Sequence, residues 1–154
     1  MNENDNYSDK VTEAVECFNN GFNCAQAILS TYCGDFGLDK ETALKTACGL
    51  GAGMGRLQET CGAVTGAYLV IGLKYGKYLE GDEPAKEITY AKVQEFARLF
   101  ALKNNTTKCR DLLGVDFLND DKQTASERVK SICPKMVRDA AEILGQILKD
   151  DEGR

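Results

Sequence analysis

The feature that most limits the fold of this chain is the spacing of its apolar residues, which recur every three or four positions between glycine-marked breaks. This spacing matches the period of an α-helix and not the alternation of a β-strand. Proline occurs only at Pro84 and Pro134. We therefore predict an all-α protein, a single-domain helical bundle of about seven to eight helices over residues 1–154, with residues 1–7 and 150–154 frayed.

Capping residues and breaks indicate where the individual helices begin and end. Ser8 is expected to cap a first helix that stops at Asn19, and Asp39 to cap a third helix. The most apolar segment, about 61–78, is predicted as the central helix of the bundle, with Thr60 as its cap. Its uninterrupted apolar run is shorter than the roughly 18 residues that a membrane span needs, so we expect no membrane insertion. The other predicted helices are 24–33, 40–48, 85–105, 109–114, 124–132 and 133–148.

Charge and composition argue against several partners and chemistries. The chain has 19 basic and 24 acidic residues, a net charge of −5, and no basic cluster longer than a pair, so we expect no nucleic-acid partner. It contains no histidine, which excludes Ser–His–Asp and Cys–His catalysis and mixed Cys/His zinc sites. The first ten residues are polar and acidic and lack the apolar region of a secretory signal, so we expect a cytoplasmic protein.

Seven cysteines are the main candidates for chemistry. In a reducing compartment, so high a content serves redox or metal chemistry more often than structural bridging. A helix N-terminus favours a thiolate, which attacks disulfides and binds metals, whereas the last turn of a helix disfavours it. Three cysteines lie in last turns and are expected only to pack: Cys17, Cys33 and Cys48. Four lie at predicted helix N-termini: Cys24, Cys61, Cys109 and Cys133.

A glycine-rich stretch, CGLGAGMGRLQETCGAVTG at residues 48–66, leads into the predicted central helix. A helix and not a strand precedes it, and it lacks the GK[ST] sequence, so a nucleotide-binding loop is not favoured. We expect its glycines to let the backbone pass close to a neighbour such as the N-terminus of the central helix. Gly62 and Gly66 form a small-residue face that would let a second cysteine-bearing helix approach Cys61.

Three segments carry a resemblance to a known family. GFNCAQAIL, CGAVTGAYLVIGLKYG and KCRDLLG, followed by Cys133, resemble the C_GCAxxG_C_C family of redox-active proteins across roughly residues 11–140. The resemblance implies a redox role and a bacterial or archaeal source, and it names no substrate. It also implies that the four family cysteines are Cys24, Cys61, Cys109 and Cys133, and it leaves the other three cysteines outside the pattern.

The first functional hypothesis is thiol–disulfide or electron-transfer chemistry. In it Cys61, left accessible by its position at a helix start, attacks and Cys24 resolves, while Cys109 and Cys133 form a second pair. Cys61→Ser is then expected to abolish activity, whereas Cys33→Ser and Cys48→Ser are nearly silent. With no histidine, Glu59 or solvent would accept the proton, and Arg56 or Arg110 would stabilise the thiolate.

Two further hypotheses use the same residues differently. In one, the four thiolates of Cys24, Cys61, Cys109 and Cys133 bind one Fe–S cluster or another metal, such as a Cys₄ zinc ion. In the other, the chain is a non-catalytic helical interaction module, for example a homodimer through the central helix. The sequence leaves these hypotheses open, together with the redox partner and the question of whether the protein is an enzyme.

Overall fold

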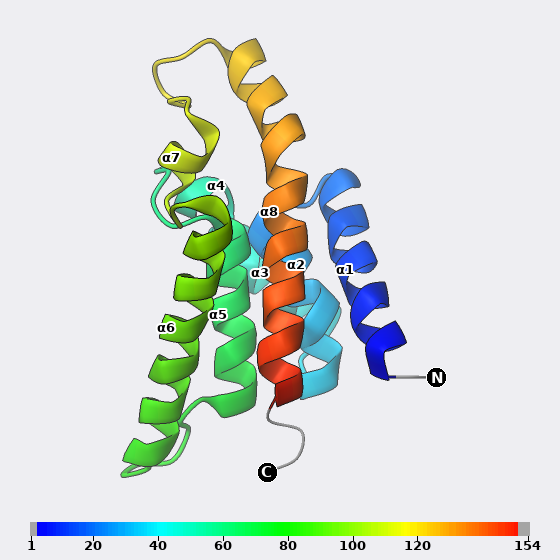
Figure 1. The fold of residues 1–154 in the computed structure, drawn as a ribbon, viewed down its shortest axis with the longest axis vertical. Helices are drawn as coiled ribbons and strands as arrows, with labels where there is room; N and C mark the ends of the chain where they lie inside the picture. Colours follow the sequence, from blue (N-terminus) through cyan, green and yellow to red (C-terminus); the bar gives the residue numbers. More distant parts are fainter. Residues whose placement is uncertain (1–2, 151–154) are drawn as a thin grey trace.

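Helices fill most of the chain between residues 3 and 150, the part that the computed structural model describes (Figure 1). In this part no β-strand is formed, and the one β-bridge pairs Thr60 with Lys108. The predicted all-α bundle is therefore confirmed. The elements are α1 (Glu3–Asn19), α2 (Cys24–Tyr32), the 3-10 helix η1 (Cys33–Phe36), α3 (Lys40–Cys48), α4 (Gly51–Met54), α5 (Gly62–Tyr75), α6 (Glu83–Asn104), α7 (Cys109–Leu113) and α8 (Lys122–Asp150).

Two short helices, α2 and α5, form the centre of the bundle. Helix α5 packs against α2, α6 and α8, and eight of the nine residues of α2 are buried. The prediction of a central apolar helix is thus confirmed, although α5 ends at Tyr75 because Gly76 takes an extended conformation. Ala63, Val64, Ala67, Val70 and Ile71 of α5 are fully buried within one chain, whereas Leu73 is 38% exposed.

The contact between α2 and α5 depends on two glycines of α5. A Cβ atom at Gly66 would lie 2.9 Å from the carbonyl oxygen of Ala25, and one at Gly62 would lie 3.2 Å from the Cβ of Cys24. Neither position has room for a side chain unless the helices move apart. The predicted small-residue face is therefore confirmed, and the helix that it admits is α2, which carries Cys24.

The first helix begins earlier than its expected cap. Helix α1 starts at Glu3, and Ser8 lies inside it, where its carbonyl accepts a bond of 3.2 Å from the Thr12 hydroxyl. The prediction of Ser8 as N-cap is therefore wrong, and residues 3–7, expected to be frayed, continue the helix. The fraying expected at residues 1–2 and 151–154 lies outside the described residues.

Helix α8 corrects a second prediction, because it joins the two helices expected at 124–132 and 133–148. It runs unbroken with Pro134 in its interior. Proline lacks the N–H that would bond to the carbonyl of Lys130, at a cost of about 3 kcal/mol. Its buried face continues on both sides of the proline, from Ala125 to Leu148, and this packing offsets the cost. Cys133 therefore lies inside a helix and not at an N-terminus, so the helix-end argument was wrong for this cysteine.

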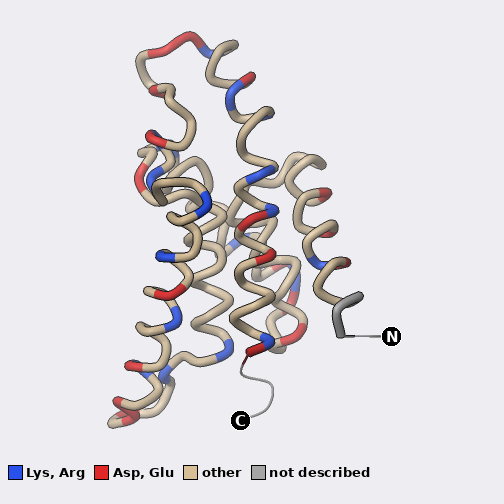
Figure 2. The backbone as a smooth tube through the Cα atoms, viewed as in Figure 1, with Lys and Arg blue, Asp and Glu red and all other residues tan. Residues whose placement is uncertain are grey.

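The surface charges are mixed along the described helices. Lys and Arg alternate with Asp and Glu over the length of the bundle, and acidic residues gather in the segment between α7 and α8 (Figure 2). Among the described residues, no helix is long and apolar enough to span a membrane.

Candidate thiol site

Two of the four candidate cysteines are held side by side by a short backbone ladder. The N–H of Cys61 donates to the carbonyl of Thr107 at 2.8 Å, and the N–H of Cys109 donates to the carbonyl of Glu59 at 2.7 Å. These bonds flank the bridge between Thr60 and Lys108. Helix α5 begins directly after Cys61 and helix α7 begins at Cys109, so both cysteines lie at helix N-termini as predicted. The cap of α5, however, is Cys61 itself and not Thr60.

Cys24 is the first residue of α2, and a complete capping box fixes its position. The N–H of Gln26 donates to Asn23 Oδ1 and the N–H of Asn23 donates to Gln26 Oε1, both at 3.0 Å. The close approach of α2 to α5 at Gly62 then brings Cys24 next to the start of α5. The predicted N-terminal position of Cys24 is confirmed.

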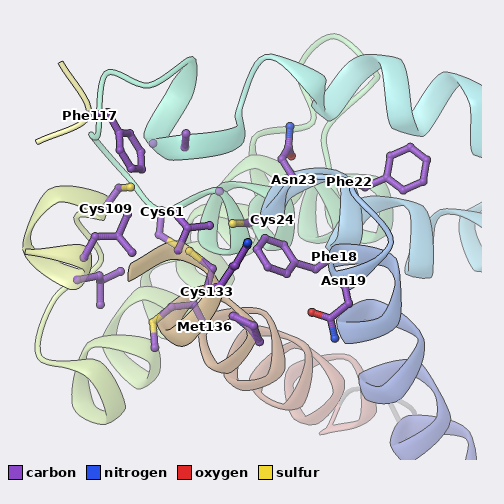
Figure 3. Close-up of a pocket in the computed structure, with 18 of the residues that line it drawn as sticks. Phe18, Asn19, Phe22, Asn23, Cys24, Cys61, Cys109, Phe117, Cys133 and Met136 are labelled. Atoms are coloured by element: carbon purple, nitrogen blue, oxygen red, sulfur yellow. The ribbon is translucent and has the colours of Figure 1, made fainter. Parts of the chain in front are cut away.

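All four cysteines line one cavity of about 430 Å³ (Figure 3). Cys133 enters it from α8, opposite the converging ends of α2, α5 and α7. Each of the four side chains is 5–8% exposed, so the thiols are almost buried. The structure therefore gathers the four residues predicted from sequence, although only three of them lie at helix N-termini.

The other three cysteines are not among the described residues that line this cavity. The Cys17 sulfur lies 3.6 Å from the Ser30 hydroxyl, and the Cys33 thiol donates to the Ser30 carbonyl at 3.3 Å. Cys48 is exposed. In the described residues all seven cysteines are free thiols.

The thiols of Cys24 and Cys133 line the same cavity, and the largest influence on the pKa of each is a hydrogen-bonding interaction with the other. Donation from the Cys24 thiol lowers the pKa of Cys133, and burial opposes this shift. The same interaction, followed by burial and the nearby thiols, raises the pKa of Cys24 well above its ordinary value. Cys133 is therefore the member of the pair that more readily becomes a thiolate.

Burial outweighs the helix N-terminus at the other two thiols. Burial raises the pKa of Cys61 to about 12 even though the backbone N–H of Ala63 bonds to its sulfur. Burial also raises the pKa of Cys109 to about 11, against the opposing effects of a Gln58 hydrogen bond and the Arg110 charge. Cys61 is 5% exposed, against 8% for Cys133, so its position at the helix start does not make it more accessible than the other thiols of the cavity.

The charged groups expected to assist the thiols differ in their positions. Arg56 and Glu59 are exposed, and neither is among the described residues that line the cavity. Arg110 is exposed too, but its charge lowers the pKa of Cys109. The expected role in stabilising a thiolate is thus supported for Arg110.

Gln58 is a residue of the site that the sequence analysis missed. Its side chain is 0% exposed, its Nε2 donates to the carbonyl of Val115 at 2.7 Å, and its Oε1 accepts from the N–H of Phe117 at 2.9 Å. It also bonds to the Cys109 thiol. A glutamine between exposed residues of a glycine-rich loop gives no signal of burial, because its partners lie more than 50 residues away along the chain.

The glycine-rich stretch forms a left-handed turn at α4. Ala52 has φ 55° and ψ 42°, and positive φ values continue through Arg56, at φ 67°. The N–H of Gly55 donates to the carbonyl of Gly51 at 2.9 Å, which closes the turn. A residue other than glycine costs roughly 1–2 kcal/mol in this conformation, so the turn is strained at Ala52, Met54 and Arg56.

Close packing on both sides holds this turn in place. The carbonyls of Ala52 and Gly53 accept from the N–H groups of Gln58 and Glu59, at 3.3 and 3.0 Å. A Cβ atom at Gly51 would collide with the side chain of Asn23, the cap of α2. The glycines therefore permit a close backbone approach, as predicted. The neighbours are the N-terminus of the central helix, where a Cβ at Gly62 would lie 3.1 Å from the Leu50 carbonyl oxygen, and also the N-terminus of α2. The turn connects the cap of α2 with the segment that carries Gln58.

The donor atoms of the site are sulfurs. Among the described residues, no group of three or more Cys, Asp or Glu side chains is arranged to hold a metal ion. The four thiols line one cavity, and among them the pKa of Cys24 and that of Cys133 are each affected most by the other.

Comparison with known proteins gives one match. A family model described as "Putative redox-active protein (C_GCAxxG_C_C)" matches residues 22–147, which include all four cysteines of the cavity. No curated protein and no solved structure matches the chain.

Proposed function

The chain belongs to the C_GCAxxG_C_C family of redox-active proteins, and on that premise we propose that Cys24 and Cys133 form a dithiol–disulfide redox pair. The observation that carries the proposal is that both thiols line one cavity, where each has the largest effect on the pKa of the other. This pairing differs from the one expected from sequence, which joined Cys24 to Cys61. Cys61 and Cys109, adjacent on the backbone ladder, then form the second pair.

The proposed mechanism begins at Cys133. Its thiolate attacks one sulfur of a disulfide substrate, the substrate S–S bond breaks, and one substrate thiolate leaves. Cys24 then loses its proton and attacks the Cys133 sulfur of the mixed disulfide, which releases the second substrate thiolate. The two cysteines are oxidised to a disulfide, the substrate is reduced to two thiols, and the two cysteine protons end on the products.

A second candidate is supported by the convergence of four thiols on one cavity. A set of four thiolates is the ligand set of Fe–S clusters and Cys₄ metal sites. Cys24, Cys61, Cys109 and Cys133 would be the ligands, and a bound cluster would supply electron transfer. Their side chains would have to move closer together to hold it, because no three Cys, Asp or Glu side chains of the described residues are arranged to bind a metal ion.

Metal analysis and disulfide mapping of protein purified without oxygen distinguish these candidates. We expect metal-free protein in which mild oxidant first removes two thiols, a reductant restores them, and mass spectrometry of this first oxidised form finds a peptide linking Cys24 to Cys133. Stoichiometric iron with visible absorbance would instead establish the cluster. Protein without metal that loses no thiols would support the non-catalytic interaction module.

Serine variants test the assignment of the pair. Cys24→Ser and Cys133→Ser are each expected to prevent the first reversible oxidation, because each removes one sulfur of the proposed disulfide. Cys48→Ser is the control, since Cys48 is exposed and outside the cavity wall. The proposed pairing is wrong if Cys61→Ser prevents the first oxidation while Cys24→Ser does not.

A further inference from the structure

We infer that the cavity beside the thiols is a substrate site for a small, uncharged disulfide with an aromatic or similarly apolar body. This inference rests on the proposed thiol–disulfide function and adds a substrate class to it. The pair must be oxidised by a molecule that reaches it, and all four thiols lie on the cavity wall. The lining of the cavity therefore selects the molecule.

Apolar side chains make up most of this lining. Phe18 and Phe117 contribute aromatic rings, and Figure 3 shows the four cysteines between these two rings. Val129, Leu112 and Met136 add aliphatic surface. Transfer of apolar groups into such a site is favourable by about 25 cal/mol per Å² of buried area.

Charged groups are scarce around the thiols. Lys130 is the one charged residue among the described residues of the lining, and its side chain is exposed. A substrate with a charge beside its disulfide would lose hydration there without gaining a buried partner. The lining therefore disfavours hydrophilic disulfides whose charges lie near the sulfurs.

Size and access are consistent with a small molecule. A volume of about 430 Å³ falls within the usual range of small-molecule sites, roughly 300–1,000 Å³. The lining includes the exposed Asn19 and Phe22, the latter 39% exposed, so the cavity reaches the surface beside the link from α1 to α2. A substrate entering there meets Phe18 and then the Cys24–Cys133 pair (Figure 3).

The reaction in this site is the thiol–disulfide exchange proposed above, and the oxidant is the small apolar disulfide. For a substrate R–S–S–R, the Cys133–S–R bond forms as the substrate S–S bond breaks, and the first R–S⁻ leaves. The Cys24–Cys133 bond forms as the Cys133–S–R bond breaks, and the second R–S⁻ leaves. Each released thiolate takes up one of the two protons lost by the cysteine thiols. The two cysteines lose two electrons when their disulfide forms, and the substrate gains these electrons when its S–S bond is broken.

The first test compares two aromatic disulfides that release coloured thiols, neutral dithiodipyridine and dianionic dithiobis(nitrobenzoate). Each rate is divided by the rate of the same reagent with glutathione, which removes intrinsic reactivity. We expect this ratio to be about ten-fold or more higher for the neutral reagent with the folded protein. Equal ratios would overturn the inference while leaving the thiol–disulfide function in place.

The second test measures binding without chemistry. The probe is 1,2-diphenylethane, in which carbon replaces both sulfurs of an aromatic disulfide, and the protein is the Cys24→Ser/Cys133→Ser double variant. We expect saturable binding by calorimetry that is weakened about ten-fold or more by Val129→Trp, which fills the cavity. Leu102→Trp is the control, since Leu102 is 71% exposed on α6 and outside the lining.

The two tests separate the two proposals. Binding of diphenylethane with no thiol oxidation by either reagent would leave an apolar site and overturn the redox function. Oxidation by both reagents with no binding, or binding unchanged by Val129→Trp, would overturn the substrate site alone.

Discussion

The four cysteines of the cavity have the same side chain, but their surroundings give them different pKa values. Burial raises the pKa of Cys61 to about 12 and of Cys109 to about 11, whereas a thiol donor lowers the pKa of Cys133. The difference arises from which effect is larger: burial outweighs the hydrogen bonds at Cys61 and Cys109, whereas the interaction with Cys24 outweighs burial at Cys133. The donor to Cys133 is Cys24. A serine at position 24 would keep a hydroxyl donor and remove the reactive thiol, so the two roles of this residue can be tested separately.

Removing the donor should raise the pKa of Cys133. In Cys24→Ala the pKa of Cys133 is expected to rise, because the interaction with Cys24 that lowers it is lost. The measurement is the rate of Cys133 alkylation by iodoacetamide as a function of pH, read by mass spectrometry. Cys24→Ser keeps a hydroxyl donor and should retain most of the wild-type profile. Superimposable profiles for the alanine and serine variants would contradict this account.

At the scale of elements, the site depends on how closely α2 approaches α5. Gly66 and Gly62 permit the contact, and the ladder between residues 59–61 and 107–109 places the start of α7 beside the start of α5. Helix α8 closes the cavity because it continues without a break on both sides of Pro134. The thiols are therefore gathered by packing between elements that are separate in sequence.

Gly66→Ala tests the helix contact. The added methyl would lie 2.9 Å from the Ala25 carbonyl oxygen, so we expect a loss of about 1–3 kcal/mol in the free energy of unfolding, measured in urea. Gly72→Ala is the matched control in the same helix, because nothing lies within 4 Å of its added Cβ. That variant should be neutral or more stable by about 0.5–1 kcal/mol, since alanine favours a helix. If the two substitutions changed the free energy of unfolding by similar amounts, the close contact between α2 and α5 would not be what restricts residue 66 to glycine.

At the scale of the whole molecule, burial of the thiols links folding to pH. A thiol with a raised pKa in the folded protein stays protonated where the unfolded chain has already lost its proton. Stability from Cys61 and Cys109 is therefore fully present below their ordinary pKa of 9.0 and is lost as pH rises toward about 12 and 11, respectively. The raised pKa of Cys24 acts in the same direction, and the lowered pKa of Cys133 acts against it.

The reduced protein should therefore be less stable at about pH 10 than at about pH 8. Each raised thiol contributes up to about 1.4 kcal/mol per pH unit above its ordinary pKa. Urea unfolding in the presence of a reductant at both pH values gives the difference. Cys61→Ala should show a smaller drop between the two pH values, because one titrating thiol is gone. A drop of the same size in this variant would mean that other groups cause the pH dependence.

Local patterns in the sequence were enough for the all-α fold, the central helix and the N-terminal positions of Cys24, Cys61 and Cys109. Caps and glycine breaks act within a few residues; the side chain of Asp39, for example, accepts from the N–H of Thr42 at 2.9 Å and caps α3 as predicted. The resemblance to the family also indicated the four cysteines that line the cavity.

The tertiary structure alone determines the burial, the neighbours and the pKa values of those cysteines. The burial of Gln58, the left-handed turn at Ala52 and the unbroken α8 around Pro134 each depend on partners far away in the chain. So do the mutual effect of Cys24 and Cys133 on their pKa values and the desolvation of Cys61. Helix ends are encoded by neighbouring residues, whereas burial and thiol pKa values are set by whichever distant segments pack against them.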